Sequence, residues 1–370
     1  MDRTKTGIYI HIPFCRSKCP YCDFYSLASS ECSEQYLTAL CNELSDKKRL
    51  KEYTGEVEGI EIDTVYFGGG TPSLMTPYQL SRVLKAVRTG FDISSDCEIT
   101  LECNPSSKGL SELLFAAADE GVNRISLGMQ SSSDCERRLL GRRGGVSEVE
   151  NAVKAAKKAG ISNISLDVMI GVPDSNEDTV RASLDKAMEL DAKHISAYIL
   201  KIEEGTYYYK HRERYNFPDE DKTADMYLFM SEYLRNNGYI HYEISNFCRD
   251  GFHSRHNMKY WDGVPYLGFG PGAHSFFNGK RFYFPRDINA FISESPAVYD
   301  GDGGDEEEKI LLSLRTFRGI SLDKRSDSFI KKAELYEKYG YGKISDGNFS
   351  LTPEGYLISN TIISELLSVN

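Results

Sequence analysis

Short apolar runs alternate, from residue 7 to about residue 201, with longer segments whose apolar residues recur every three or four positions. The short runs are rich in Ile, Val, Leu and Tyr, which is typical of β-strands, and the longer segments have the period of amphipathic helices. The pattern predicts strands at residues 7–12, 62–67, 98–102, 124–127, 165–170 and 194–200. It predicts helices between them at residues 33–52, 76–90, 108–120, 147–159 and 177–190.

Six strand–helix units in series predict an α/β fold, in which helices cover the outer side of a parallel sheet. Eight such units would close a complete barrel, so six predict a partial, TIM-like (β/α)6 barrel. We place this barrel in residues 1–240. In barrels the chemistry lies at the carboxyl ends of the strands, so residues that follow the predicted strands are the first candidates for a functional site.

The rest of the chain has a different pattern. We predict that residues 241–300 form a connecting segment, because the glycine- and histidine-rich stretch 251–275 has the composition of an ordered loop. The acidic, glycine-rich stretch 300–308 indicates a domain boundary. Helix patterns at 309–315 and 329–339, a Gly-Asn turn and a last helix to about residue 368 predict a small α+β, winged-helix-like domain in residues 301–370.

Composition narrows the range of functions. The chain has 370 residues, a net charge of −11 and 40% hydrophobic residues, which is ordinary for a globular enzyme. The negative charge argues against broad binding of nucleic acid, which needs a basic face, so we favour a scaffold or lid role for the C-terminal domain. No apolar run approaches the roughly 18 residues of a membrane span. Six of the nine cysteines are scattered, which predicts reduced thiols in a cytoplasmic protein.

Three cysteines follow the first predicted strand at close spacing: Cys15, Cys19 and Cys22. Structural zinc sites use four ligands, usually in two separated pairs, whereas [4Fe–4S] clusters are held by cysteine thiolates. Three thiolates would leave one iron open for a small molecule. The alternative is a chance group of buried cysteines. The spacing resembles the radical S-adenosylmethionine (radical SAM) superfamily, whose cluster binds the methionine part of SAM at that iron.

Glycine and polar residues follow the later strands. Gly-Gly-Gly-Thr-Pro at residues 68–72 follows the second strand, and glycine lets a ligand approach the backbone closely. Glu102, Gln130 and Asp167 lie at or near the ends of the next three strands, and Arg142 follows Gln130 by twelve residues. An arginine can bind a carboxylate through two hydrogen bonds, and a carboxylate can bind ribose hydroxyls. Each residue taken singly has a structural alternative, but together at one rim they predict one pocket.

Four short sequences make the resemblance more specific. They are His-Ile-Pro-Phe-Cys at residues 11–15, Gly-Gly-Gly-Thr-Pro at 68–72, Ser-Leu-Gly-Met-Gln at 126–130 and Gly-Val-Pro at 171–173. They resemble the oxygen-independent coproporphyrinogen III oxidase family and its close relatives, the HemW heme chaperones, over nearly the whole chain. The resemblance implies that Cys15, Cys19 and Cys22 hold the cluster. It implies contacts with SAM from Tyr9, Tyr21, Gly69, Gly70, Thr71, Glu102, Gln130, Arg142 and Asp167.

Two features distinguish these two branches. The oxidases have a fourth cysteine two residues after the third, and this chain has Phe24 there. The sequence His-Asn-Met-Lys-Tyr-Trp at residues 256–261 matches the His-Asn-x-x-Tyr-Trp motif of the chaperones. Because neutral imidazole is a good ligand of heme iron, we predict His256 as a heme ligand. The alternative is that His256 caps a loop and the tryptophan fills core. Rival ligands are His241, His253 and His274.

These features favour a radical SAM heme chaperone that binds a [4Fe–4S] cluster, SAM and heme and transfers heme to acceptor hemoproteins, with those of the respiratory chain as the first candidates. The alternative is an oxygen-independent coproporphyrinogen III oxidase, although Phe24 argues against that activity. A third hypothesis is a nucleic-acid-binding winged helix with the cluster as a redox sensor. The glycines at 268–272 lack the spacing and the strand–helix frame of a dinucleotide site. Peripheral membrane association and a homodimer stay open.

Overall fold

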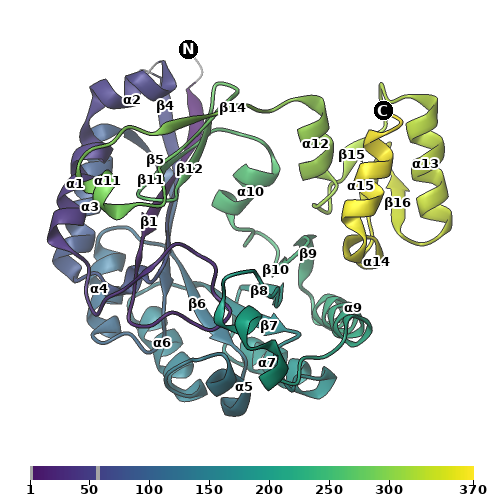
Figure 1. Ribbon diagram of the computed structural model, residues 1–370, viewed down its shortest axis with the longest axis horizontal. Coiled ribbons are helices and arrows are strands. Elements are labelled where there is room, and N and C mark those ends of the chain that lie inside the picture. The colour runs from purple at the N-terminus through teal and green to yellow at the C-terminus, as the bar shows by residue number, and fades with distance from the viewer. Residues whose placement is uncertain (1–2, 56–58) are drawn as a thin grey trace.

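A large sheet forms the centre of the computed structural model, which describes residues 3–55 and 59–370. The sheet has twelve strands, and helices surround its outer face (Figure 1). Six neighbouring strands are parallel, as predicted, and form the partial barrel. In spatial order they are β1 (Thr4–Ile12), β4 (Ile60–Gly69), β5 (Asp92–Cys103), β6 (Arg124–Gln130), β7 (Asn163–Ile170) and β8 (His194–Ile199).

The helices between these strands lie close to their predicted positions. The helix predicted at residues 33–52 is two helices, because the Asp46 side chain accepts the backbone N–H groups of Lys48 and Arg49 and so begins a second one. The helices are α1 (Glu34–Ser45), α2 (Lys47–Thr54), α3 (Pro77–Gly90), α4 (Leu110–Asp119), α5 (Asp134–Leu139), α6 (Val146–Lys158) and α7 (Glu177–Glu189), with a 3-10 turn η1 (Pro72–Leu74).

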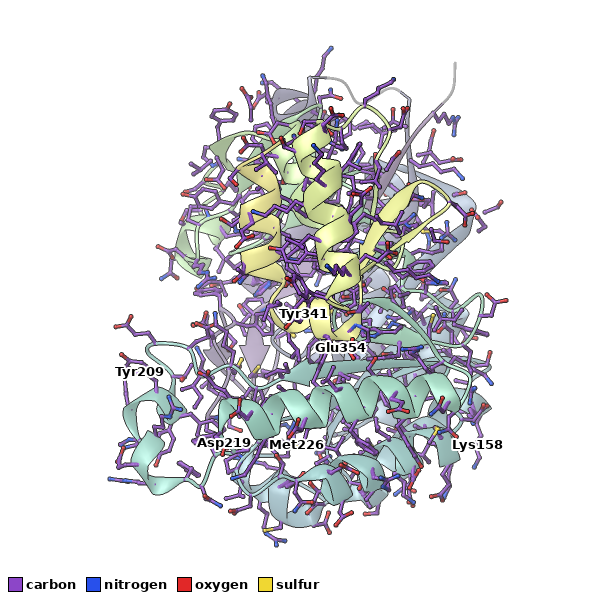
Figure 2. The ribbon with its side chains drawn as sticks, turned by 90° about the vertical axis from the view of Figure 1, so that its right-hand side faces the viewer. Lys158, Tyr209, Asp219, Met226, Tyr341 and Glu354 are labelled. Atoms are coloured by element: carbon purple, nitrogen blue, oxygen red, sulfur yellow. The ribbon has the colours of Figure 1, made fainter. Side chains whose placement is uncertain are left out.

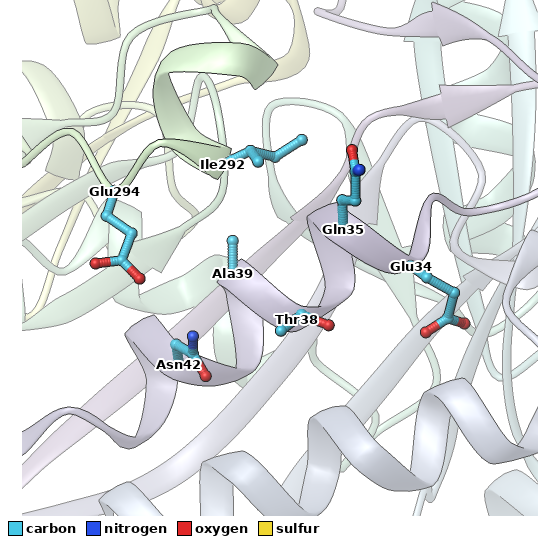
Figure 3. A pocket seen from close by; sticks show the side chains of 7 residues that line it. All are labelled: Glu34, Gln35, Thr38, Ala39, Asn42, Ile292 and Glu294. Carbon is cyan, nitrogen blue, oxygen red and sulfur yellow. The ribbon is translucent and has the colours of Figure 1, made fainter.

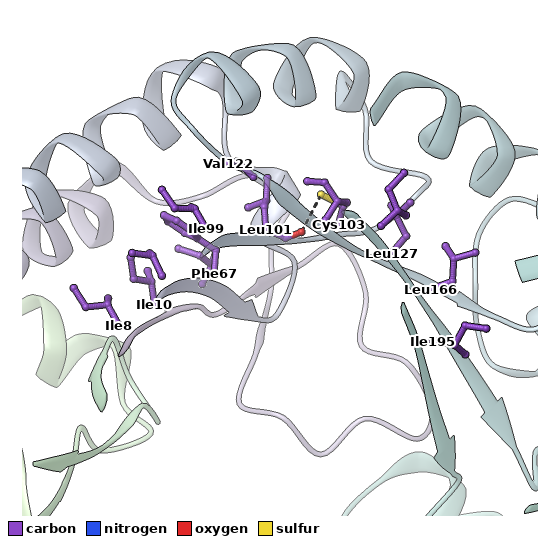
Figure 4. Close-up of a cluster of buried hydrophobic side chains, with 14 of the residues drawn as sticks. Ile8, Ile10, Phe67, Ile99, Leu101, Cys103, Val122, Leu127, Leu166 and Ile195 are labelled. Atoms are coloured by element: carbon purple, nitrogen blue, oxygen red, sulfur yellow. Dashed lines mark hydrogen bonds between the residues drawn. The ribbon is translucent and has the colours of Figure 1, made fainter. Parts of the chain in front are cut away.

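Apolar side chains on the outer face of the sheet form the main core. Ile8, Ile10, Phe67, Leu101 and Leu127 are buried between the strands and the helices (Figure 4). Burying each such side chain contributes about 1.5–3 kcal/mol. Because side chains alternate along a strand, the residues between them face the interior of the barrel, and many of these are polar. The outer face therefore stabilises the fold, and the inner face is available for chemistry.

Residues 241–300 differ from the predicted connecting segment, because they add strands to both edges of the sheet. The prediction of a loop at 251–275 is wrong: this stretch contains a helix, one complete strand and the start of another. Its short apolar runs pair with strands far away in sequence, which local composition does not reveal. The added elements are β9 (Ile240–Glu243), β10 (Asn246–Cys248), α10 (Arg255–Trp261), β11 (Tyr266–Phe269), β12 (His274–Phe277), β13 (Lys280–Tyr283), α11 (Ile288–Ile292) and β14 (Val298–Asp302).

Helix α10 packs against strands β4 and β5 of the barrel. Lys259 forms a buried ion pair with Asp63 of β4 at 2.7 Å. Glu98 of β5 accepts the backbone N–H groups of Arg255 and His256. The His-Asn-x-x-Tyr-Trp motif therefore lies level with the middle of β4 and β5 rather than at the carboxyl ends of the strands.

The C-terminal domain packs beside α9 (Glu220–Asn236) and β9, as Figures 1 and 2 show. Backbone hydrogen bonds join Ile244 N–H to the Arg315 carbonyl and Phe317 N–H to the Tyr242 carbonyl, each at 3.0 Å. Its three-stranded sheet includes a short strand that the sequence analysis did not predict. The elements are α12 (Glu306–Ser313), β15 (Ile320–Ser321), α13 (Asp327–Lys338), β16 (Gly342–Ser345), β17 (Asn348–Leu351), α14 (Pro353–Leu357) and α15 (Ser359–Leu367). In the described ranges, no helix has both the length and the apolar character needed to cross a membrane.

Candidate functional site

The three cysteines lie in one loop at the carboxyl end of β1. Cys15 belongs to the short strand β2 (Phe14–Cys15), which pairs with β3 (Leu27–Ala28), so both ends of the loop are tied together. The Cys22 N–H donates to the Cys19 carbonyl at 3.1 Å, which closes a tight turn between these two cysteines. All three thiols are free and partly exposed. The loop therefore presents its cysteines at the end of the barrel where chemistry is expected.

The thiols share one electrostatic neighbourhood. Burial raises the pKa of Cys22, and the neighbouring Cys19 and Cys15 raise it further, so the three groups lie near one another. Over residues 3–55 and 59–370, no three His, Cys, Asp or Glu side chains converge on a site for a single metal ion. In an iron–sulfur cluster each thiolate binds a different iron, so the three cysteines need not converge on one metal ion. The donor set, three free thiols in one loop, is suitable for such a cluster.

The glycine motif packs against the start of the cysteine loop. It lies at the end of β4, and a Cβ on Gly70 would be 2.7 Å from the Phe14 carbonyl oxygen and 2.8 Å from that of Ile12. Gly69 has a positive φ of 107°, which favours glycine. The Thr71 hydroxyl lies 3.4 Å from the Cys15 sulfur. Glycine is therefore needed for packing here, in addition to the ligand approach that the sequence suggests.

We expect Gly70→Ala to lower the free energy of unfolding by about 3 kcal/mol, because the new methyl group would meet backbone that cannot turn aside. Urea unfolding measures this loss. The matched control is Gly160→Ala, where a Cβ would meet nothing within 4 Å and only a positive φ of 89° opposes the change. We expect a loss of about 1 kcal/mol there. Equal losses in the two variants would contradict the packing argument.

Tyr9, Tyr66 and Glu102 form a connected group on the inner face of the barrel. The Tyr66 hydroxyl donates to Glu102 Oε1 at 2.7 Å, and the Tyr9 ring stacks on the Tyr66 ring with centroids 6.2 Å apart. Burial raises the pKa of Glu102 to about 7, and the negative charge of Asp167 adds to the effect. Glu102 is thus a carboxyl group that gains or loses its proton near neutral pH.

Asp167 and Arg142 extend this group across the barrel. The Ser126 hydroxyl donates to Asp167 Oδ1 at 3.1 Å. Burial raises the pKa of Asp167 to about 6, although Ser126 and Arg142 oppose the shift. Burial would lower the pKa of Arg142, but Tyr21, Cys19 and Asp167 raise it on balance. Arg142 Nε is buried without a hydrogen-bond partner, so this side chain has unused capacity to donate to a ligand.

Gln130 has an unusual backbone at the end of β6. Its φ is 68°, and the pairing of β6 with β7 shifts register between Gly128 and Gln130. A side chain at Gly128 would meet the Arg142 guanidinium at 2.2 Å, so glycine there leaves room for the arginine. A left-handed conformation in a non-glycine residue is uncommon and is often found at ligand sites. The structure therefore brings Gln130 and Arg142 to the same rim as the cysteines.

Arg124 lies within the barrel and is a candidate site residue that was not predicted from the sequence. Arg124 is 1% exposed, has no ion-pair partner within 4 Å among the described residues, and its Nε has no hydrogen bond. Its positive charge lowers the pKa values of Glu102 and Asp167 against the dominant effect of burial. Arg124 faces inward two positions before Ser126, so the alternation of β6 could have indicated it.

His256 lies against the inner-face group but farther from the rim: its ring stacks on those of Tyr66 and Tyr9, with centroids 5.2 and 6.5 Å away. It is 1% exposed, and its ring nitrogens contact the Thr64 hydroxyl at 2.9 Å and the Tyr260 hydroxyl at 2.8 Å. Burial lowers its pKa to about 3, so the ring is neutral. Thr64 lies five residues before the end of β4, about 16 Å along the strand from the rim. Iron binding at His256 would require the loss of one of these hydrogen bonds.

A pocket outside the barrel contains none of the predicted site residues. It lies between α1 and α11 (Figure 3). Its lining is formed by Glu34, Gln35, Thr38, Ala39, Asn42, Ile292 and Glu294. This pocket is therefore separate from the candidate site at the rim.

The chain is similar to known proteins over most of its length. The model of the Radical SAM superfamily matches residues 9–187. The heme chaperone HemW of Lactococcus lactis is 33% identical over 92% of this chain and 89% of its own length. HemW of Bacillus subtilis is 31% identical over 97% and 98%. The chain belongs to the HemW family. This confirms the family predicted from the motifs at residues 11–15, 68–72, 126–130 and 171–173.

A solved structure shows that the fold of this HemW-family chain extends to its C-terminal domain. Coproporphyrinogen III oxidase (HemN) from Escherichia coli aligns with a TM-score of 0.81 and covers 99% of this chain and 91% of its own, at 20% identity. At this identity the likeness establishes the fold alone. Phe24, where the oxidase pattern has its fourth cysteine, is 70% exposed. No sulfur ligand is available at that position.

Proposed function

We propose that this chain is a heme chaperone, which binds heme and passes it to acceptor hemoproteins. The observation that carries the proposal is the 31–33% identity to HemW proteins over nearly the whole chain. The chain resembles them from the cysteine loop through the C-terminal domain, so the proposal uses the complete arrangement rather than one motif. Respiratory hemoproteins are the proposed acceptors, and a cytoplasmic location remains our prediction.

The rim would hold the cofactors of this function. Cys15, Cys19 and Cys22 would bind a [4Fe–4S] cluster and leave one iron open. Arg142 and Asp167 lie at the same rim, and Arg142 has a buried nitrogen without a partner, so it fits a carboxylate such as that of SAM. The remaining proposed contacts are Tyr9, Tyr21, Gly69, Gly70, Thr71, Glu102 and Gln130. When bound, the cluster supplies an electron for reductive cleavage of SAM.

The second candidate is an oxygen-independent coproporphyrinogen III oxidase. The shared fold favours it. Phe24 argues against it, because the resemblance implies that the oxidases need a cysteine there. Two vinyl groups formed from propionates during anaerobic turnover with SAM and a reductant would establish this activity.

The test of the proposal is a heme titration of the full chain, reconstituted anaerobically with iron and sulfide. We expect saturable binding of one heme with a Kd in the micromolar range or below, seen as a new Soret band, which corresponds to about −8 kcal/mol. Transfer is then measured by mixing the loaded protein with an apo-hemoprotein and following the acceptor spectrum. Absence of saturable binding would overturn the proposal, and formation of protoporphyrinogen from coproporphyrinogen would favour the oxidase.

A further inference from the structure

The seven histidines of the chain differ in whether a ring nitrogen is available to an external metal. Three of them are buried, with both nitrogens in hydrogen-bond contact. The contacts of His11 are with Tyr9 and Tyr25, those of His194 with Ser165 and Tyr242, and those of His256 with Thr64 and Tyr260. Heme iron needs a free lone pair, so these three do not offer one.

Two more histidines are enclosed. His241 contacts Ser231 through Nδ1, its Nε2 is buried, and its ring lies 4.0 Å from the Phe247 ring. The Nε2 of His253 is also buried without a partner. A porphyrin carries its iron at the centre of a wide, flat ring, so a buried nitrogen cannot reach it without local opening. His211 and His274 remain.

His211 has two exposed tyrosines beside it. It follows helix α8 (Tyr207–Lys210) and precedes the turn η2 (Arg212–Arg214). The Tyr207 ring lies 4.3 Å from the His211 ring, and Tyr207 is 47% exposed. Tyr209 is 53% exposed and lies at the outer edge of the molecule in Figure 2. His274 is also exposed, stacks on Tyr283 and has Arg281 and Arg286 as charged neighbours, so it is the rival ligand that the test below includes.

Basic residues flank His211 on both sides. Lys210 and Arg212 are exposed, and no ion pair is formed by either side chain within the described residues. Arg214 lies 3.6 Å from Glu213, so its charge is partly neutralised. In a chain with a net charge of −11, this local positive charge complements a dianionic ligand. Heme combines such a charge, from its two propionates, with a flat aromatic surface and a metal.

This segment is attached to the cysteine loop. The Tyr208 N–H donates to the Pro20 carbonyl at 3.0 Å, and the Tyr208 hydroxyl donates to the Leu139 carbonyl at 2.7 Å. Pro20 lies between Cys19 and Cys22. Tyr208 therefore anchors residues 207–214 at the rim and leaves the neighbouring side chains exposed.

We propose that residues 207–214 form the heme-docking segment, in which the His211 imidazole binds the iron. Tyr207 and Tyr209 contact the macrocycle, since aromatic rings pack well on flat apolar surfaces. Lys210 and Arg212 bind the propionates. The inference rests on the proposed heme-chaperone function and adds a site to it. It also brings the heme next to the cluster loop.

The test uses the full, cluster-loaded chain and heme titration of wild type, His211→Ala, His274→Ala and His256→Gln. We expect His211→Ala to weaken binding by about tenfold or more and to lose the iron–histidine stretching band of ferrous heme in resonance Raman spectra. We expect the other two variants to keep that band. If the wild-type protein binds heme and the His211→Ala variant gives the same spectrum as wild type, this inference is overturned and the proposed function is left intact.

A second variant tests the charges. Lys210→Gln with Arg212→Gln keeps the imidazole and removes two exposed cations, so folding is not at risk. We expect about tenfold weaker binding and a smaller dependence of the Kd on salt. Unchanged affinity and salt dependence would exclude these residues as propionate partners. No saturable heme binding by wild type would instead be a failure of the proposed function.

Discussion

Cys19→Ser is expected to abolish assembly of the cluster, lowering the iron content from about four atoms per chain to near zero after anaerobic reconstitution. Cys19 lies in the turn that its carbonyl closes with the Cys22 N–H. Serine keeps that backbone hydrogen bond and the side-chain size but lacks the thiolate that iron requires. Iron and acid-labile sulfide analysis, with the absorbance of the cluster near 400 nm (about the usual position for such clusters), measures the result.

Cys135→Ser is the matched control. Cys135 is an exposed, free cysteine in α5, outside the cysteine loop. We expect it to retain full iron and sulfide, so general loss of a thiol does not explain the effect. Normal iron and sulfide in Cys19→Ser would exclude Cys19 as a ligand. Zinc in place of iron and sulfide in wild type would remove the basis of the cofactor assignment altogether.

The six parallel strands could be predicted because each combines a short apolar run with a following amphipathic helix. Ile8, Ile10 and Phe67 bury their side chains against those helices, so the local pattern carries the core. The elements at residues 241–300 could not be predicted in the same way. Their positions depend on distant pairing, such as Gly7 of β1 with Tyr266 of β11. A one-dimensional pattern contains no signal for such partners.

The residues of the candidate site also fall into those that local sequence predicts and those that depend on distant contacts. Residues that the motifs contain, such as Cys15, Gly70 and Gln130, lie at one rim as expected, because the carboxyl ends of parallel strands meet there. Arg124 was missed, because its effect on the pKa values of Glu102 and Asp167 depends on its burial near them in the folded barrel. His256 matches a motif, yet its surroundings are fixed by α10 and β4, which the sequence alone does not bring together.

Glu102→Gln is expected to weaken SAM binding by about tenfold above neutral pH, equivalent to about 1.4 kcal/mol, because an ionised carboxylate accepts hydroxyl hydrogen bonds more strongly than an amide. The pKa of Glu102 is about 7 and that of Asp167 about 6, both raised mainly by burial. Wild-type affinity should therefore fall as the pH decreases through 7 and then 6, as the two groups gain protons. Isothermal titration calorimetry of the cluster-loaded protein at several pH values measures both effects. The variant should lose the part of the pH dependence centred near 7, and an unchanged affinity and profile would exclude Glu102 from the SAM site.

Glu243→Gln is the control that separates an effect on SAM affinity from an effect on the stability of the fold. Burial raises the pKa of Glu243 to about 7 as well, but its partners are Asn246 and the Ser245 N–H, near the C-terminal domain. A carboxyl group with a raised pKa in the folded state binds its proton more tightly there than in the unfolded chain. Glu102 and Glu243 therefore each lower the free energy of unfolding as the pH rises from about 4.5, the pKa in the unfolded chain, to about 7, by at most about 3.4 kcal/mol. Both glutamine variants should show a smaller loss of stability over this range in urea unfolding without SAM, because glutamine does not ionise. Only Glu102→Gln should also weaken SAM binding. Equal SAM affinities in the two variants would mean that Glu102 affects the stability of the fold and not SAM binding.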